Sequence, residues 1–432
     1  MKRRLSLLLV MTLLTTTFMA CGKESEEPQA TNTEPTEAVD TVEEEAKEEV
    51  VEESAPTYAI TSVEADGYDY FTGSVQCIQI TDDKHPALAE AIDNQFSELV
   101  TTFNKGIDDM NSEAEQLNAE NKKYAEEDSD IEYNEISYSD EYSVEVVRCD
   151  SKVFSFVMYE YIYMGGAHGT TEELGFTYDA NTGELLELSS FGDEQTIKEV
   201  AANFILDTIN DSDQQAKDML FPEDDITGGY ETAITESFEG DAVPEYYLDS
   251  RGITFLFQQY SIAPYAAGII AFTVPYEELE GFNEAYLPDD GFYTATLSEI
   301  GFIEKIDIDN DSELEEVYLT SGDVEDSDVV QTEYVLFLGD KSVSHTIDGY
   351  SYISGTYIHG DDGNYVLISC EGVSVTLFEV SNGIKELGSL ETEGAVKEIK
   401  DGEFVLATRV YDENGVSWGE PEAHKFSKNG IE

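Results

Sequence analysis

An acidic loop in the last third of the chain carries the clearest pattern for chemistry. Carboxylates stand at positions one, three, five and nine of a short segment before an apolar strand, namely Asp307, Asp309, Asp311 and Glu315. Oxygen ligands at this spacing can converge on one hard cation, with Glu313 adding its backbone carbonyl. The loop therefore predicts a calcium site, and a bare acidic turn is the alternative.

A glycine-rich loop between two aromatic runs is the second candidate. His168 lies in this loop, Gly165–Gly169, and Tyr163 ends the strand-like run before it. Tyr265 lies in a second loop of small residues, Ser261–Gly268. Three glycines in five positions allow backbone angles that are closed to other residues. We expect Tyr163, His168 and Tyr265 to be ligand contacts rather than catalytic groups, because a lone histidine seldom acts as a catalyst without a partner.

Sequence patterns typical of enzymes are missing. The other four histidines are scattered, without the His-x-x-x-His or Cys-x-x-Cys spacing of zinc sites. There is no Gly-x-Ser-x-Gly elbow and no phosphate-binding loop. Carboxylates are so abundant that choosing any two as a glycosidase pair would be arbitrary. We therefore predict no catalytic residues and no enzymatic activity.

The elements that must position the aromatic loops form a predicted α+β module over residues 58–283. Apolar residues recur at steps of three and four through Leu88–Met110, which predicts a helix. A second helix is predicted over Glu194–Ile209. Strand-like runs surround both helices, including a hairpin over Tyr246–Phe257 and a strand at Leu185–Leu188 after the glycine loop hairpin. This interspersed order predicts a mixed sheet with packed helices.

Helical periodicity disappears after Leu287. Short strands alternate with Asp, Gly and Asn turns, which predicts a separate all-β domain over residues 287–432. Three weakly similar units each place an acidic turn before an apolar strand: Ile303–Leu319, Thr356–Ser369 and Val396–Ala407. We expect blade-like sheets, although three units are too few for a comfortable closed propeller.

The charge of the 432-residue chain is extreme. Its 94 acidic and 22 basic residues give a formal net charge of −72. Such a surface repels nucleic acid and attracts cationic proteins and divalent metal ions. A cationic protein partner is therefore expected, and a nucleic-acid partner is not.

The N-terminus predicts export and a lipid anchor. A basic start at Lys2–Arg4 precedes an apolar stretch too short to span a bilayer comfortably, and Phe18–Cys21 resembles a lipobox. Residues 1–21 are thus a predicted lipoprotein signal peptide with lipidation at Cys21, and an ordinary secretory signal is the alternative. Diacylation would hold the protein on the outer face of the cell membrane.

A predicted disordered tether over residues 22–57 follows the signal. It contains thirteen acidic and two basic residues and is rich in Glu, Thr and Pro, so it repels itself and stays extended. Of the remaining cysteines, Cys77 and Cys149 lie in strand-like runs and Cys370 is far away. A Cys77–Cys149 disulfide and free thiols both remain open.

Two stretches of the α+β module resemble one family. The first is Tyr161–Gly169 with Phe176–Asp179 and Thr182–Leu188, and the second is Tyr260–Gly268 with Val274–Tyr276. They resemble the extracytoplasmic module of unknown function found beside peptidoglycan deacetylase domains and in lysozyme-sensing anti-sigma factors. The resemblance implies a cell-wall context and, from the anti-sigma members, lysozyme binding. The acidic loop is similar to calcium loops of secreted blade-repeat proteins, with Ser312 in place of the usual glycine.

These observations favour a lipid-anchored, non-enzymatic binding protein of the cell surface. Its ligand would be a lysozyme-like cationic protein or another envelope component. A cell-wall glycan enzyme or accessory protein, and a structural spacer, are the alternatives.

Overall fold

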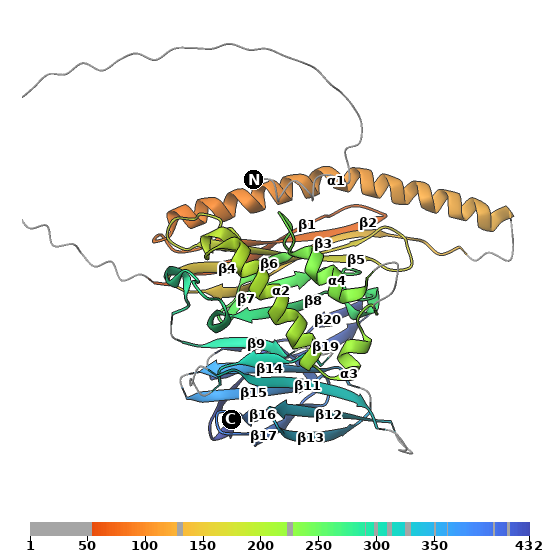
Figure 1. The fold of residues 1–432 in the computed structure, drawn as a ribbon. Helices are drawn as coiled ribbons and strands as arrows, with labels where there is room; N and C mark the ends of the chain where they lie inside the picture. Colours follow the sequence, from red (N-terminus) through yellow and green to blue (C-terminus); the bar gives the residue numbers. More distant parts are fainter. Residues whose placement is uncertain are drawn as a thin grey trace, which may run out of the picture. The chain divides into compact units, whose positions relative to one another are not determined.

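A computed structural model describes residues 54–127, 133–222, 228–289, 291–297, 301–308, 313–324, 330–349, 351–360, 362–400, 402–412 and 415–432 (Figure 1). The predicted signal peptide, Cys21 and most of the predicted tether lie outside these residues. Asp309 and Asp311 of the predicted calcium loop also lie outside them.

The first layer is a five-stranded sheet in the order β1-β2-β3-β4-β5. All neighbours are antiparallel except the parallel pair β2–β3, and the helix α1 forms the crossover between these two strands. The elements are β1 (Tyr58–Glu64), β2 (Phe71–Ile80), α1 (Pro86–Glu127), β3 (Tyr138–Cys149), β4 (Val153–Tyr163) and β5 (Thr170–Asp179).

Helix α1 lies along one face of this sheet (Figure 1). Its predicted apolar stripe is buried there, with Leu88, Ile92 and Phe96 at most 3% exposed. The helix has 42 residues and continues past Met110, with Ala114 buried and Leu117 partly buried in the same core, so the apolar stripe extends beyond the predicted range. The Asn118 side chain accepts the Ile136 backbone N–H at 2.9 Å and donates to its carbonyl at 2.7 Å. A single tertiary contact of this kind cannot be seen in helical periodicity.

A second layer holds helices and a three-stranded sheet in the order β6-β7-β8. It adjoins β5 closely, because a Cβ on Gly175 would collide with the Tyr246 carbonyl, and the Leu248 N–H donates to Thr177 Oγ1 at 3.0 Å. The elements are α2 (Glu194–Asp211), α3 (Gln214–Asp218), α4 (Gly229–Ser237), β6 (Glu245–Leu248), β7 (Gly252–Phe257) and β8 (Ile270–Pro275).

One predicted strand of the module is wrong. Leu185 makes only an isolated bridge with Tyr178, and Leu188–Ser190 is a 3₁₀ turn. Leu186 and Leu188 instead pack into the core of the second layer, so burial rather than strand pairing explains this apolar run.

The C-terminal part consists of antiparallel sheets, so the prediction of an α+β module followed by all-β structure is confirmed. The sheet orders are β10-β11-β12-β13, β17-β16-β15-β14-β9 and β18-β19-β21-β22, with β20 paired to β19. The strands are β9 (Tyr293–Leu297), β10 (Glu304–Ile306), β11 (Glu315–Asp323), β12 (Gln331–Leu338), β13 (Lys341–Asp348), β14 (Ile353–Gly360), β15 (Gly363–Cys370), β16 (Ser374–Glu379), β17 (Lys385–Glu391), β18 (Gly394–Lys400), β19 (Glu403–Asp412), β20 (Gly415–Trp418), β21 (Glu422–Ser427) and β22 (Gly430–Ile431).

The sheet containing β15 is covered on both faces, which explains its nearly continuous apolar run. Val366 and Ile368 pack towards the sheet of β11 and β12, whereas Tyr365 and Leu367 pack towards the sheet of β19 and β21. The three weakly similar units of the sequence are the hairpins β10–β11, β14–β15 and β18–β19, one in each sheet. Within the described residues, the two core clusters join neighbouring sheets and neither joins the first to the third.

Candidate functional site

The two loops predicted to contact a ligand meet in the structure. The His168 ring stacks on the Tyr265 ring, with centroids 3.8 Å apart and planes at 27°. The Tyr163 hydroxyl donates to the Gly166 carbonyl at 3.1 Å. The structure thus brings His168 and Tyr265 together and ties Tyr163 to the same loop.

Side-chain amides hold the second loop against the first sheet. β5 is an edge strand with unpaired backbone groups. Gln258 accepts the Glu173 N–H at 3.1 Å and donates to the Glu173 carbonyl at 2.7 Å, and Gln259 accepts the Thr171 N–H at 3.2 Å. These bonds occupy the free edge of β5 and bring the residues that follow, including Tyr260, beside the glycine loop.

An exposed aromatic surface results, and we call it the aromatic loop surface. It is formed by Tyr161, Met164, His168, Tyr260 and Tyr265. Tyr161, Met164 and Tyr260 are 38%, 46% and 57% exposed, which is high for large apolar side chains. Tyr260 has a φ of 66° and is the only non-glycine residue of the described ranges with a positive φ. Such strain at a bulky residue is more common at functional sites than elsewhere.

The glycines of the first loop have different roles. Gly165 has a φ of 77°, as expected for a turn that needs left-handed backbone. Gly169 has an ordinary φ, but a Cβ there would collide with the Tyr161 ring. Close packing against Tyr161, rather than backbone freedom, therefore explains why position 169 requires glycine.

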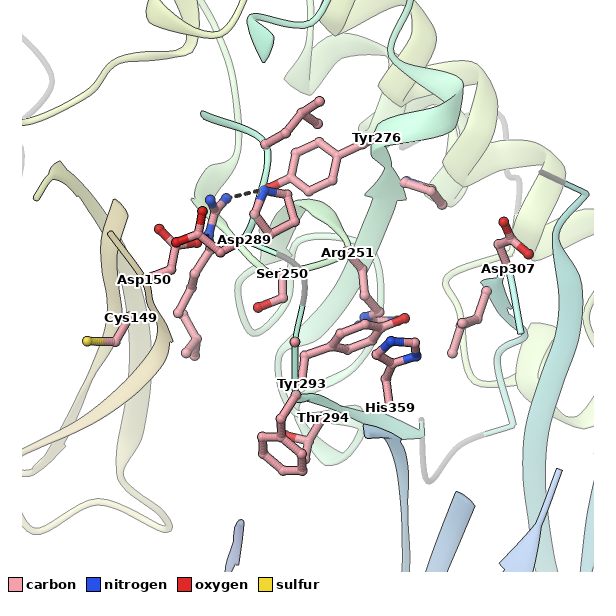
Figure 2. Close-up of a pocket in the computed structure, with 18 of the residues that line it drawn as sticks. Cys149, Asp150, Ser250, Arg251, Tyr276, Asp289, Tyr293, Thr294, Asp307 and His359 are labelled. Atoms are coloured by element: carbon pink, nitrogen blue, oxygen red, sulfur yellow. Dashed lines mark hydrogen bonds and ion pairs between the residues drawn. The ribbon is translucent and has the colours of Figure 1, made fainter. Parts of the chain in front are cut away.

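A cavity of about 620 Å³ lies elsewhere, between the end of β3, the turn before β7, the end of β8 and the segment that leads into β9 (Figure 2). We call it the arginine cavity, after Arg148 and Arg251 in its wall. The Arg148 Nε donates to Asp150 Oδ2 at 2.7 Å, and its Nη1 donates to the Tyr276 hydroxyl at 2.8 Å. Tyr276 in turn donates to the Asp249 carbonyl at 2.6 Å.

Arg251 extends the same network. Its Nη1 donates to Glu304 Oε2 at 2.8 Å, and its Nη2 contacts Asp249 Oδ2 at 3.3 Å and Thr273 Oγ1 at 3.1 Å. Burial opposes the charge, but Asp249 and Glu304 outweigh it and raise the pKa of Arg251 above its usual range. Burial raises the pKa of the Tyr276 hydroxyl, which remains a neutral donor.

A second cavity of about 670 Å³ shares Arg251 with the first and is more acidic. Glu145 of β3 and Glu173 of β5 line it, with Tyr159 of β4 between them, and the Tyr159 hydroxyl donates to Glu145 Oε2 at 3.0 Å. Burial, and secondarily the charge of Glu145, raises the pKa of Glu173 to about 7.

The predicted calcium loop is only partly described. Its Ile308 N–H donates to Glu315 Oε2 at 2.8 Å, and the Asn364 amide of β15 donates to the Ile308 carbonyl. Asp307 and Glu313 have partners of their own. Among the residues that the structure describes, no group of three or more His, Cys, Asp or Glu side chains is placed to hold a metal ion. Calcium binding therefore stays a prediction.

The thiols of the first sheet are free. Cys149 Sγ donates to the Pro56 carbonyl at 3.1 Å. The parallel pairing of β2 and β3 ends at Val75 and Tyr142, and the same register continued by two residues brings Cys77 level with Val144. A strand rise of about 3.3 Å per residue then separates the two cysteines by roughly 16 Å along the sheet. A disulfide cannot span that distance.

Sequence reasoning missed the arginine cavity completely. One signal was present: the chain has only five arginines, and two of those belong to the predicted signal peptide. Arg148 and Arg251 each lie two residues from an aspartate, in Arg148–Asp150 and Asp249–Arg251. A rare cation beside a carboxylate in so acidic a chain favours a buried ion pair.

The fold and these sites define an α+β module with a β-rich C-terminal part, and the comparisons with known families agree. Residues 64–171 match the family model described as deacetylase PdaC, and residues 193–277 match the protein family of unknown function DUF3298. The chain therefore carries the module of unknown function that is shared with PdaC-type proteins. The aromatic loop surface includes residues from both matched regions.

Two solved structures of the DUF3298 family are similar to this chain. The protein from Bacteroides fragilis is 18% identical with a TM-score of 0.41, and the match covers 54% of this chain and 96% of that one. The protein from Pseudomonas aeruginosa is 15% identical with a TM-score of 0.35, covering 54% and 97%. No curated protein matches. Among the described helices, none is both long enough and apolar enough to cross a bilayer.

Proposed function

We propose that this chain is a lipid-anchored binding protein on the outer face of the cell membrane, and that the aromatic loop surface is its contact site. The proposal rests on one observation above the others: exposed aromatic side chains from two distant loops converge, with His168 stacked on Tyr265 and Tyr260 held in a strained backbone. Exposed, preorganised aromatic residues are typical anchors of protein interfaces.

The charge of the chain suggests the chemistry of the ligand. A net charge of −72 accelerates the approach of a cationic protein and repels an anionic one. A lysozyme-like cationic protein fits this charge, as does another basic envelope component. The cell-envelope setting is inferred from the family resemblance of the motifs, and the match of residues 64–171 to a model described as deacetylase PdaC agrees with that resemblance.

The test uses the chain from residue 22 onward, without the lipid. We expect it to bind lysozyme, with binding weakened by about 0.5 M salt, where the Debye length is roughly 4 Å. Tyr260→Ala and Tyr265→Ala should each weaken binding about tenfold, whereas Tyr124→Ala should not. Tyr124, on α1, is a matched control because it is 59% exposed, close to the value for Tyr260.

Non-specific attraction must be separated from recognition. Cytochrome c, another basic protein, should bind more weakly and without sensitivity to Tyr260→Ala. If lysozyme and cytochrome c bind alike, or if the tyrosine variants bind as the parent does, the aromatic loop surface is not the contact site.

A second candidate function has its own support in the second cavity. Glu145 and Glu173 lie two strands apart, roughly 10 Å between backbones, and the raised pKa of Glu173 suits a general acid. If the protein cleaves wall glycan, it should release products from peptidoglycan, and Glu173→Gln should abolish the release. Unchanged release in this variant would exclude the pair.

The anchor and the metal loop are tested separately. Cys21→Ala should move the protein from the membrane fraction to the medium, since diacylation needs this thiol.

Millimolar calcium should raise the melting temperature of the chain, and Asp309→Ala should remove the rise. If calcium does not change the melting temperature, the loop is not a metal site.

A further inference from the structure

The two edges of the first sheet differ in how their backbone groups are occupied. At the β5 edge, Gln258 and Gln259 bond the strand through their side-chain amides. At the other edge, β1 pairs only with β2 within the described residues. The β1 edge is therefore open to a further strand, and the proposed function does not use this feature.

The pairing of β1 with β2 determines which backbone groups face outward. The Thr81 N–H donates to the Thr57 carbonyl at 2.7 Å, and the Ala65 N–H donates to the Gly73 carbonyl at 2.9 Å. Both pairs continue the antiparallel register of the strand, so the odd-numbered residues of β1 bond to β2. The N–H and C=O groups of the even-numbered residues therefore point away from the sheet. These residues are Tyr58, Ile60, Ser62 and Glu64.

The side chains of β1 give this edge little protection against a partner strand. Tyr58 and Ile60 are 40% and 44% exposed, and they project from the same face because they are two residues apart. The seven-residue strand has no Pro or Lys, which commonly block such edges, and Glu64 at its end is its only charge. The edge strand β13, by contrast, begins with Lys341. An exposed edge of this composition is typical of sites of strand addition.

Charge indicates the kind of strand that can pair with β1. Glu64 is followed by Asp66 and Asp69, and all three carboxylates are exposed. At the other end of the strand, Asp83 and Lys84 are exposed and offset each other. A second copy of the chain would bring another net charge of −72 to this edge and is repelled, whereas a basic segment is attracted.

We propose that the β1 edge binds an extended basic segment of another protein by strand addition. The segment pairs antiparallel with β1, because this arrangement is slightly more stable per residue than the parallel one. Its apolar side chains lie opposite Tyr58 and Ile60, and a basic side chain lies opposite Glu64. Backbone hydrogen bonds to the even-numbered residues supply affinity, and the opposing side chains supply specificity.

The probe for the test is the peptide Lys-Thr-Thr-Thr-Val-Thr-Val, acetylated and amidated at its ends. In the antiparallel register, its first position lies opposite Glu64 and its last opposite Tyr58, so the N–H groups of its odd positions face β1. N-methylation of the odd positions removes these donors. N-methylation of the even positions changes only the solvent side and leaves the charge of the peptide the same.

Binding to the chain from residue 22 is measured by calorimetry at about 0.15 M salt, where exposed charges are partly screened. We expect the unmodified probe to bind with a Kd below about 1 mM. Methylation of the odd positions should weaken binding at least about tenfold, because several hydrogen bonds are lost together, and methylation of the even positions less than about twofold.

Protein variants test the same edge from the other side. Ser62→Pro removes one outward N–H and is compatible with an edge strand, so it should weaken the unmodified probe about fivefold to tenfold. Ser62→Ala keeps the backbone donor and should bind as the parent does. Melting curves of both variants show whether they are folded.

A charge reversal gives a second test that does not alter the backbone. Glu64→Lys should weaken the lysine probe and strengthen a probe with glutamate in place of its lysine. Glu333→Lys, an exposed position on β12 with the same change in charge, should leave the preference for the lysine probe unchanged.

Three results would overturn the proposal. The first is that the unmodified probe does not bind, or binds no better than the probe methylated at its odd positions. The second is that Glu64→Lys and Glu333→Lys have the same effect. The third is a dimer of the parent chain in sedimentation that Ser62→Pro dissociates, because a second copy then occupies the β1 edge.

Discussion

Buried charge is treated in opposite ways in two regions of the molecule. Around the arginine cavity, opposite charges meet: Arg251 contacts Glu304 and Asp249, and Arg148 contacts Asp150. Under α1, like charges meet: Asp140 of β3 is 8% exposed, its Oδ1 has no hydrogen-bond partner, and Glu160 of β4 is its largest charged neighbour. Burial first, and then these neighbours, raises the pKa of Asp140 to about 7.

The difference teaches how a strongly acidic chain can still bury carboxylates. A carboxylate beside an arginine stays charged and fixes the position of its partner. A carboxylate beside other carboxylates keeps a proton, which lowers the free-energy cost of burying it. The stability of that region therefore depends on pH.

The largest expected effect comes from breaking the paired region. Arg251→Met should lower the free energy of unfolding by about 3–5 kcal/mol, because Glu304 is left buried without its partner. Adding Glu304→Leu should recover part of the loss in chemical denaturation, since the pair is then replaced by apolar groups. Lys123→Met is the control, because its ion pair with Glu127 is exposed and should be worth less than about 0.5 kcal/mol. Equal losses for the two single variants would contradict the comparison.

Neutralising Asp140 in the like-charge region should raise the free energy of unfolding instead of lowering it. The unfolded aspartate has a pKa of about 3.9 and the folded Asp140 about 7, so stability falls as the pH rises through this window. Asp140→Asn should nearly equal the parent near pH 4 and exceed it by roughly 4 kcal/mol at pH 8, because the two pKa values differ by about three units and each unit is worth about 1.4 kcal/mol. Denaturation at a series of pH values measures this. Asp109→Asn, an exposed position on α1, should leave the pH profile unchanged.

If Asp140→Asn is less stable than the parent at pH 8, the carboxylate is charged and has a partner, and the contrast between the two regions fails.

A smaller loss of stability is expected when only the Tyr276 hydroxyl is removed from the paired region. Tyr276→Phe removes the hydroxyl that accepts from Arg148 and donates to the Asp249 carbonyl. We expect a loss of about 1–3 kcal/mol, because two buried groups lose a partner while the ring packing stays. A melting curve suffices as the measurement. Tyr318→Phe, on β11 in the C-terminal part, provides a comparison outside the network, and an equal loss there would argue against a special role for Tyr276.

The sequence by itself determined most of the elements, because local periodicity reports which side of a helix or strand is buried. The apolar stripe from Leu88 to Met110, the helix at Glu194 and the turn-rich C-terminal strands were all visible in this way. The family motifs also led to His168 and Tyr265, whose rings prove to be in contact.

Only the tertiary structure decided the rest, because the deciding contacts join residues far apart in the chain. Asn118 ties the second half of α1 to the Ile136 backbone, and core packing replaces the expected strand near Leu188. Arg148 and Arg251 lie on different layers of the module, and no periodicity shows that Tyr276 and Asp249 connect them. Residue types can suggest that a rare arginine is paired, but its partner depends on how distant strands come together.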